Sequence, residues 1–163
     1  MTWTLAIFLI LSIPLPQNTT PDFHFQGKRT LIDRDTTDLD DGLNETLIDE
    51  SNDGILRSPL SFDGSDFWYG WDGKAERLHP QHGAQLARGG TAEAGYLGCS
   101  KAIYAKGVIR IDDLPVGSHI CVHTNEGRYA EMRIESFDRK KKTISFTFTT
   151  WKKNESDTTY QPH

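Results

Sequence analysis

The stretch His119-Ile-Cys-Val-His-Thr-Asn-Glu-Gly-Arg-Tyr-Ala-Glu-Met-Arg-Ile134 (HICVHTNEGRYAEMRI) decides the fold class. Apolar and polar side chains alternate on both sides of the short segment Asn125-Glu126-Gly127, and this period of two is typical of β-strands buried on one face. Gly127 can adopt the left-handed backbone conformation that a tight hairpin turn needs. The stretch therefore predicts an antiparallel hairpin with Asn125–Arg128 at its tip.

Two further segments show the same alternation. Ile144, Phe146 and Phe148 alternate with polar residues in the segment that ends at Trp151. Earlier in the chain, the aromatic run Phe67-Trp68-Tyr69-Gly70-Trp71 has the pattern of another half-buried strand. No segment combines a sustained helical period with capping residues. The sequence therefore predicts an all-β fold, either a small antiparallel β-sandwich or a barrel.

Charge divides the chain into two parts. Residues 18–58 hold ten acidic and four basic residues, whereas residues 59–163 hold thirteen acidic and fourteen basic ones, so the net charge of −5 belongs to the first part. A nearly neutral main body gives no electrostatic basis for nucleic-acid binding. We predict a polar linker at residues 18–30, a β-rich domain at residues 31–152 and a polar C-terminal tail at residues 153–163.

The first residues, 1–17, read MTWTLAIFLILSIPLPQ and contain an uncharged apolar run from Leu5 to Leu15. Such a run is shorter than the roughly 20 residues of a membrane span and suits the hydrophobic region of a signal peptide. No basic residue precedes it and no Ala-x-Ala pattern follows it. We expect a signal peptide or a short anchor holding the chain to a membrane through residues 2–15, hence a secreted or extracytoplasmic protein; a buried segment or a truncated membrane helix is the alternative.

Cys99 and Cys121 form an even pair, which suits a disulfide in an oxidising compartment. Linking them closes a loop of about 22 residues, which the chain-entropy relation values at about 3 kcal/mol. A metal site is the alternative, because His119 and His123 share a strand face with Cys121. A zinc site normally needs three or four protein ligands, and the sequence contains no CxxC motif and no HxxxH helix to supply them. We therefore predict one disulfide in the β domain, with surface histidines beside it and no metal.

Catalytic patterns are sparse. Nucleophilic catalysis needs a placed base and an orienting third group, and the chain contains no G-x-S-x-G motif. Asp112 and Asp113 lie beside a Pro-Gly turn, where aspartate commonly forms local hydrogen bonds. We expect no catalytic residue and no cofactor, hence a non-enzymatic module for extracytoplasmic ligand binding or sensing. A secreted hydrolase or metal-dependent enzyme and a purely structural envelope protein are the alternatives.

The acidic segment Asp33–Gly42 raises the question of calcium. An EF-hand loop that began at Asp33 would have Thr37 and Asp38 at its fifth and sixth positions, where the motif needs Asp or Asn and then Gly. The register therefore fails. A less regular calcium site that uses Asp38, Asp40 and Asp41 stays open beside the simpler interpretation, a solvated linker followed by a strand and a turn.

Exposed aromatic side chains on a rigid sheet can stack on a sugar ring or a peptide, although core packing is the commoner use of such residues. The aromatic run and the hairpin tip are the segments best suited to a binding surface. The predicted surface consists of Trp68, Trp71, Asn125, Glu126 and Arg128. The expected partner is an envelope or extracellular protein, peptide or glycan, and not a nucleic acid.

Short segments along residues 30–152 together resemble an uncharacterised bacterial β-rich module, which occurs in secreted proteins and is appended to some membrane-anchored serine/threonine kinases. In chain order they are Thr37-Asp-Leu-Asp-Asp-Gly42, Ser65-Asp-Phe-Trp68, Gly83-Ala-Gln-Leu-Ala87, Gly95-Tyr-Leu-Gly-Cys-Ser100, Leu114-Pro-Val-Gly117, Ile120-Cys-Val122, Thr124-Asn-Glu-Gly-Arg128 and Thr149-Thr-Trp151. The resemblance implies that the first segment belongs to the domain as a strand and turn, and that the two cysteines are structural partners. It implies no kinase activity, because the chain contains no kinase segment.

Overall fold

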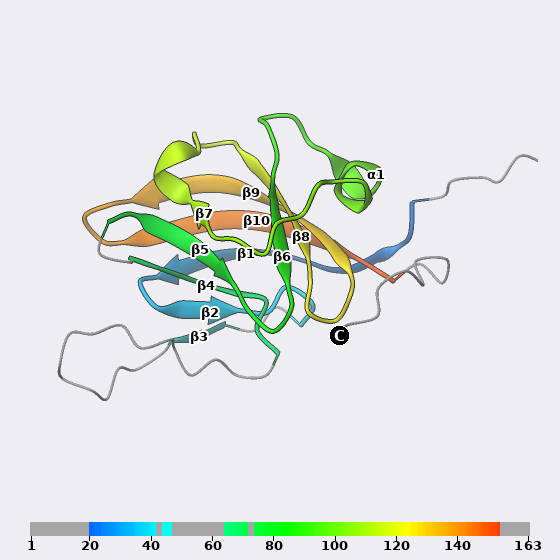
Figure 1. Cartoon of the computed structure of the whole chain (residues 1–163), viewed down its shortest axis with the longest axis horizontal. Helices are drawn as coiled ribbons and strands as arrows, with labels where there is room; N and C mark the ends of the chain where they lie inside the picture. Colours follow the sequence, from blue (N-terminus) through cyan, green and yellow to red (C-terminus); the bar gives the residue numbers. More distant parts are fainter. Residues whose placement is uncertain (1–19, 42–43, 47–63, 72–73, 154–163) are drawn as a thin grey trace, which may run out of the picture.

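The computed structural model describes residues 20–41, 44–46, 64–71 and 74–153, which build two five-stranded antiparallel sheets (Figure 1). The first sheet contains, in spatial order, β1 (Phe23–Ile32), β10 (Thr143–Trp151), β9 (Tyr129–Asp138), β8 (His119–His123) and β6 (Gln85–Arg88). The second contains β3 (Asn44–Thr46), β2 (Asp35–Thr37), β4 (Phe67–Trp71), β5 (Glu76–Pro80) and β7 (Ile109–Arg110).

The two sheets share one apolar core. Buried side chains from both sheets form a single cluster, and the rings of Phe67 on β4 and Phe146 on β10 lie 6.2 Å apart between centroids. Leu31, Leu78 and Met132 belong to the same cluster and are fully buried. Burial of these faces from water supplies the main driving force for joining the sheets. The fold is therefore a small antiparallel β-sandwich, as the alternation predicts.

The hairpin predicted by the opening stretch is present as β8 and β9. Val122 pairs with Ala130 and Ile120 with Met132 across the two strands, and all four side chains lie in the core. At the tip, the Gly127 N–H donates to the Thr124 carbonyl at 3.0 Å with Gly127 at φ +78°. The left-handed conformation at this glycine is the one that the turn requires.

Cys121 lies on the opposite face of β8 and is bonded to Cys99, so the predicted disulfide is confirmed. Cys99 belongs to a short helix, α1 (Gly95–Ser100), and the disulfide joins this helix to the outer face of the first sheet (Figure 1). A second apolar cluster surrounds it and consists of Ala87, Tyr96, Cys99, Cys121 and Trp151. The sequence did not predict this helix, because a six-residue helix is too short to produce a detectable helical period.

The polar linker expected at residues 18–30 is wrong for most of its length. Residues 23–30 belong to β1, which pairs with β10 along both strands. β1 lies at the edge of the sheet and most of its side chains are exposed or half-buried, so its composition is polar and lacks a clear apolar alternation. Phe25 nevertheless stacks on Phe148 of β10, with ring centroids 5.7 Å apart.

The acidic segment also belongs to the domain. β2 begins at Asp35, and the side chains of Asp38 and Asp40 in the following turn are buried. A solvated linker is therefore wrong for this segment. The predicted signal peptide or anchor at residues 1–17 lies outside the described residues, as does nearly all of the predicted tail at residues 153–163. No helix in the described ranges is long and apolar enough to cross a membrane.

Candidate ligand-binding site

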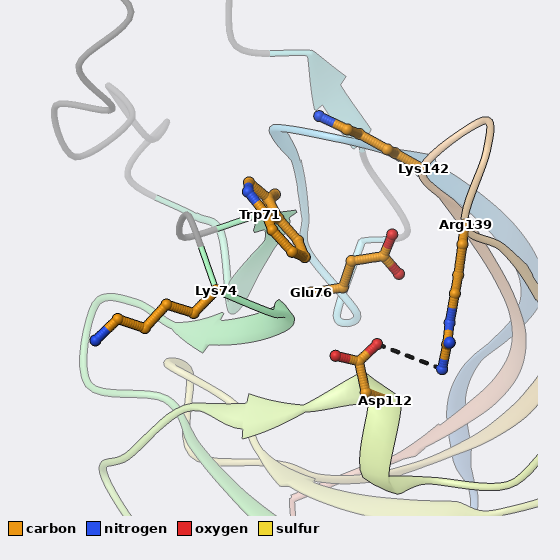
Figure 2. A pocket seen from close by; sticks show the side chains of 6 residues that line it. All are labelled: Trp71, Lys74, Glu76, Asp112, Arg139 and Lys142. Atoms are coloured by element: carbon orange, nitrogen blue, oxygen red, sulfur yellow. Dashed lines mark ion pairs between the residues drawn. The ribbon is translucent and has the colours of Figure 1, made fainter.

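A pocket of about 480 Å³ opens beside the end of β4 (Figure 2). Five parts of the fold contribute to it: the end of β4, the β4–β5 connection, the start of β5, the 3₁₀ turn η1 (Ile111–Asp113), and the turn between β9 and β10. The lining residues are Trp71, Lys74, Glu76, Asp112, Arg139 and Lys142. The volume falls within the roughly 300–1,000 Å³ of small-molecule sites.

Trp71 supplies the aromatic wall. It is the last residue of β4 and follows Phe67 and Tyr69 on the same strand face, but those two side chains are fully buried whereas Trp71 is 37% exposed. The Trp71 N–H donates to Asp33 Oδ1 at 2.9 Å, which anchors the strand end. The sequence pattern did not decide whether this aromatic run packs in the core or is exposed. In the structure, its first residue, Phe67, lies in the core, and its last residue, Trp71, lines the pocket.

Glu76 is the unusual member of the pocket. It lies opposite Trp71 in the β4–β5 register, on the same strand face as the buried Leu78. Glu76 is only 4% exposed, and the buried Tyr69 phenol is the hydrogen-bonding neighbour of its carboxylate. Figure 2 shows the Glu76 carboxylate directed into the space between Trp71 and Arg139.

The buried carboxylate affects its neighbour Tyr69. Burial raises the pKa of the Tyr69 phenol, and the charge of Glu76 raises it further. The phenol therefore keeps its proton under physiological conditions. The Glu76 carboxylate thus has two neutral aromatic neighbours, Tyr69 and, across the β4–β5 pair, Trp71.

The rim of the pocket is charged but balanced. Arg139 forms an ion pair with Asp112 at 3.7 Å (Figure 2), and Lys142 forms one with Asp33 at 3.4 Å. The three basic side chains that line the pocket are therefore matched in number by three acidic ones, Glu76, Asp112 and the adjacent Asp33. A balanced rim does not select for a strongly charged ligand.

The pocket contains only part of the predicted binding surface. Trp68 points away from the core and stacks on His79 of β5 at 3.8 Å, and it does not line the pocket. Asn125, Glu126 and Arg128 do not line it either. Of the five predicted residues, Trp71 alone belongs to the pocket.

The hairpin tip instead contacts the acidic turn after β2. The Asn125 N–H donates to Asp66 Oδ1 at 2.8 Å, and Arg128 pairs with both Glu126 and Asp40, the latter at 3.4 Å. The tip thus brings the TNEGR segment against the SDFW and TDLDDG segments. Asp66 had no part in the sequence-based site, because nothing in its local pattern separates it from any aspartate that precedes a strand.

The two histidines beside Cys121 are buried, so the expectation of surface histidines is wrong. His119 Nδ1 lies 2.8 Å from Glu131 Oε1, and His123 packs against Tyr104 and Tyr129. Each ring is buried because it has a polar or aromatic neighbour on this outer face. Cys121 is bonded to Cys99 and cannot serve as a thiolate ligand beside these rings.

Sequence reasoning also missed most of the pocket. No sequence pattern marked Lys74 or Glu76 as a site residue. Asp112 was interpreted as a residue that forms local hydrogen bonds in a turn. Arg139 and Lys142 lie in the charged turn between β9 and β10. One signal was available: Glu76 stands two residues before Leu78 in a strand, at a position where the alternation calls for an apolar side chain. A charged residue at an inward position needs a partner or a function.

No family model and no curated protein matches this sequence. Among solved structures, the crystal structure of the Tannerella forsythia apo HmuY analog (TFO) is similar, with 12% sequence identity and a TM-score of 0.49. The match covers 79% of this chain and 97% of that chain. At this distance the likeness assigns neither a family nor a ligand.

Proposed function

We propose that this protein is an exported, non-enzymatic β module that binds a neutral, hydroxyl-rich ligand, a glycan, in the pocket beside Trp71. The observation that carries the proposal is the pocket in which the partly exposed indole of Trp71 lies opposite the carboxylate of Glu76 in the β4–β5 register. A sugar offers both things this arrangement can use: an apolar ring face for the indole and O–H groups that donate to the carboxylate.

The energetics favour this combination. A hydrogen bond from a sugar hydroxyl to a carboxylate contributes about 1.5–3 kcal/mol, and a carboxylate oxygen can accept more than one such bond. The indole adds apolar contact area at low conformational cost, since a tryptophan side chain has few rotamers to fix. A hydroxylated, uncharged ligand also suits the balanced charges at the rim.

Export is the second part of the proposal. The Cys99–Cys121 disulfide supports an oxidising compartment, because disulfides rarely persist in the cytosol. The uncharged apolar run near the N-terminus supports the same interpretation. An exported module would be in the same compartment as glycans of the envelope or of the cell exterior.

The test is a glycan array with the purified protein, followed by calorimetric titration of the best neutral oligosaccharide. Trp71→Ala should weaken binding by about 10- to 100-fold, as expected for a central tryptophan anchor. Glu76→Leu should weaken it similarly, because the acceptor is lost. Trp68→Ala is the matched control, since its indole lies outside the pocket, and it should bind like the unmodified protein.

Three results would contradict the proposal or part of it. Equal binding by Trp71→Ala and the unmodified protein would place the glycan elsewhere, and an empty array would remove the ligand class. Release of shorter sugars during incubation, detected by chromatography, would overturn the non-enzymatic part, since Glu76 and Asp112 are two carboxylates in one pocket.

A further inference from the structure

A smaller pocket of about 210 Å³ opens on the outer face of the first sheet, the face of β8 that carries Cys121. Strand register builds its floor. His119 of β8 and Thr147 of β10 both lie opposite Arg133 of β9, so the three residues form one row across the sheet and all line the pocket. Glu93, the exposed residue before the N-cap of α1, lines it as well.

His119 is the largely buried polar residue of this pocket, and Glu131 decides where its proton lies. The His119 side chain is only 9% exposed, and its Nδ1 lies 2.8 Å from Glu131 Oε1. The two oxygens of Glu131 already accept backbone N–H groups, those of Ala94 and Gly95. The carboxylate is therefore an acceptor toward the imidazole as well, and Nδ1 carries the proton of the neutral ring. The lone pair of the ring then lies on Nε2.

This Nε2 has no hydrogen-bond partner among the described residues. The backbone groups of His119 are already used, because its N–H donates to Gly90 and its carbonyl accepts from Gly89. Nε2 is thus the polar atom that His119 has left for a ligand. An acceptor in a largely buried side chain favours a ligand that donates an N–H or O–H group. The bond from Nδ1 to a carboxylate also fixes the orientation of the ring, as it does for imidazoles that hold ligands.

The remaining polar groups make the pocket rich in acceptors and negative in charge. Thr147 Oγ1 donates its proton to Glu135 Oε1 at 3.1 Å, so its oxygen lone pairs remain. The guanidinium of Arg133 is paired with the same carboxylate at 2.7 Å. Glu93 and Glu131 therefore line the pocket as two negative charges, whereas its one guanidinium is already offset by Glu135.

We propose that this pocket binds a primary ammonium group, which donates an N–H to His119 Nε2 and lies near the carboxylate of Glu93. An ammonium offers three donors, a positive charge and no acceptor, which matches a negative pocket of acceptors. The volume is below the roughly 300–1,000 Å³ of sites for drug-sized ligands. It therefore suits a small amine or the end of a lysine side chain.

Other ligand classes match the pocket less well. An anion would be repelled by Glu93 and Glu131. A metal ion would need converging ligands, and the ligand atoms of Glu93, His119 and Glu131 do not all lie within 4.8 Å of one another. The inference is independent of the glycan pocket, because the two pockets share no lining residue.

The test is an NMR titration of the whole ¹⁵N-labelled chain at about pH 8, where an ordinary histidine is neutral and a primary amine is protonated. In the free protein, the imidazole spectrum of His119 should show a protonated Nδ1 and an unprotonated Nε2. Propylammonium chloride should shift the Nε2 resonance with a Kd of about 10⁻³ M, as expected for so small a ligand. Tetramethylammonium chloride has the same charge but no N–H donor, and it should leave Nε2 unchanged.

Matched variants separate Nε2 from the rest of the pocket. His119→Asn places an amide N–H at the position of Nδ1 and removes Nε2, so it should bind propylammonium about tenfold less tightly, as followed by the backbone amides of Thr147 and Thr149. Glu93→Gln should bind it about two- to fivefold less tightly, because the lost charge is exposed. His24→Asn is the control, because His24 is exposed and outside the pocket, and it should bind like the unmodified protein. Thermal unfolding of every variant checks the fold.

A second arm replaces the free amine by a blocked Gly-Lys-Gly peptide. Tighter binding of the peptide assigns the ammonium to a lysine side chain of a partner, and tighter binding of propylammonium assigns it to a small free amine. The proposal is overturned if neither probe shifts Nε2 at decimolar concentration, if tetramethylammonium binds as tightly as propylammonium, or if His119→Asn binds like His24→Asn.

Discussion

Trp68 and His79 lie face to face across neighbouring strands, with ring centroids 3.8 Å apart and ring planes 9° apart. They are directly opposite in the β4–β5 register, so their side chains emerge from the same sheet face. That face is the one that points away from the core. The indole is consequently half-buried by an imidazole rather than by the apolar interior.

This arrangement predicts the effect of Trp68→Ala. The variant should fold and lose about 1–2 kcal/mol in the free energy of unfolding, the sum of one aromatic pair and partial burial of one indole. Urea denaturation followed by circular dichroism measures the change. A loss above about 4 kcal/mol would contradict the outward placement, because only core truncations reach that size.

Gly70 predicts a second effect at the same place. A Cβ added there would lie 2.2 Å from Cζ3 of Trp68 and 3.2 Å from Asp33 Oδ1. Gly70→Ala should therefore displace the indole from His79 and cost about 1–3 kcal/mol. The same substitution in a Trp68→Ala background should cost much less, and a double-mutant cycle measures the difference. Equal costs in both backgrounds would show that the alanine disturbs the backbone instead.

The disulfide predicts the redox behaviour of the protein. Mass spectrometry of the non-reduced, alkylated protein should find no free thiol, because Cys99 and Cys121 are bonded to each other. Reduction should lower the free energy of unfolding by about 3 kcal/mol, the value for a loop of this length. Two alkylated cysteines in the non-reduced sample would contradict the pairing.

Glu131 predicts the stability of α1. Its carboxylate accepts the N–H groups of Ala94 at 2.7 Å and Gly95 at 2.9 Å, the two residues where the helix begins. In Glu131→Gln one of these oxygens becomes an NH₂ group that cannot accept, so one N–H loses its partner at a cost of about 1–3 kcal/mol.

Hydrogen exchange of the α1 amides measures this effect locally. The amides of residues 95–100 should exchange faster in Glu131→Gln, while those of β10 keep their rate. Glu93→Gln is the control, because Glu93 is exposed and directly precedes Ala94, the N-cap of α1. Unchanged exchange in α1 would mean that the disulfide alone holds the helix.

Alternation predicted the strands that place an apolar face in the core. β8, β9 and β10 each have one face in the core, so their apolar residues recur with a period of two. β1 was missed because an edge strand keeps many side chains in water and needs no apolar face of its own. α1 was missed because a disulfide and a carboxylate stabilise it, and neither produces a local sequence pattern.

The candidate sites show the same limit. Trp71 was recognisable because an aromatic residue at a strand end is conspicuous, and His119 because it lies two residues from a cysteine. Glu76 and Glu131 were not, because each acquires its role from a partner on another strand or turn. Local patterns predict which face a residue occupies; strand register decides what it meets there.

Asp66 has one further consequence, which concerns folding order. Its two hydrogen bonds reach Leu39 and Asn125, 27 and 59 residues away in sequence, so each closes a long loop, and we expect both to form late in folding. Contacts that form after the transition state act on the rate of unfolding rather than on the rate of folding. The two hydrogen bonds of Asp66 should therefore mainly slow the unfolding of the folded β-sandwich and have little effect on its rate of folding.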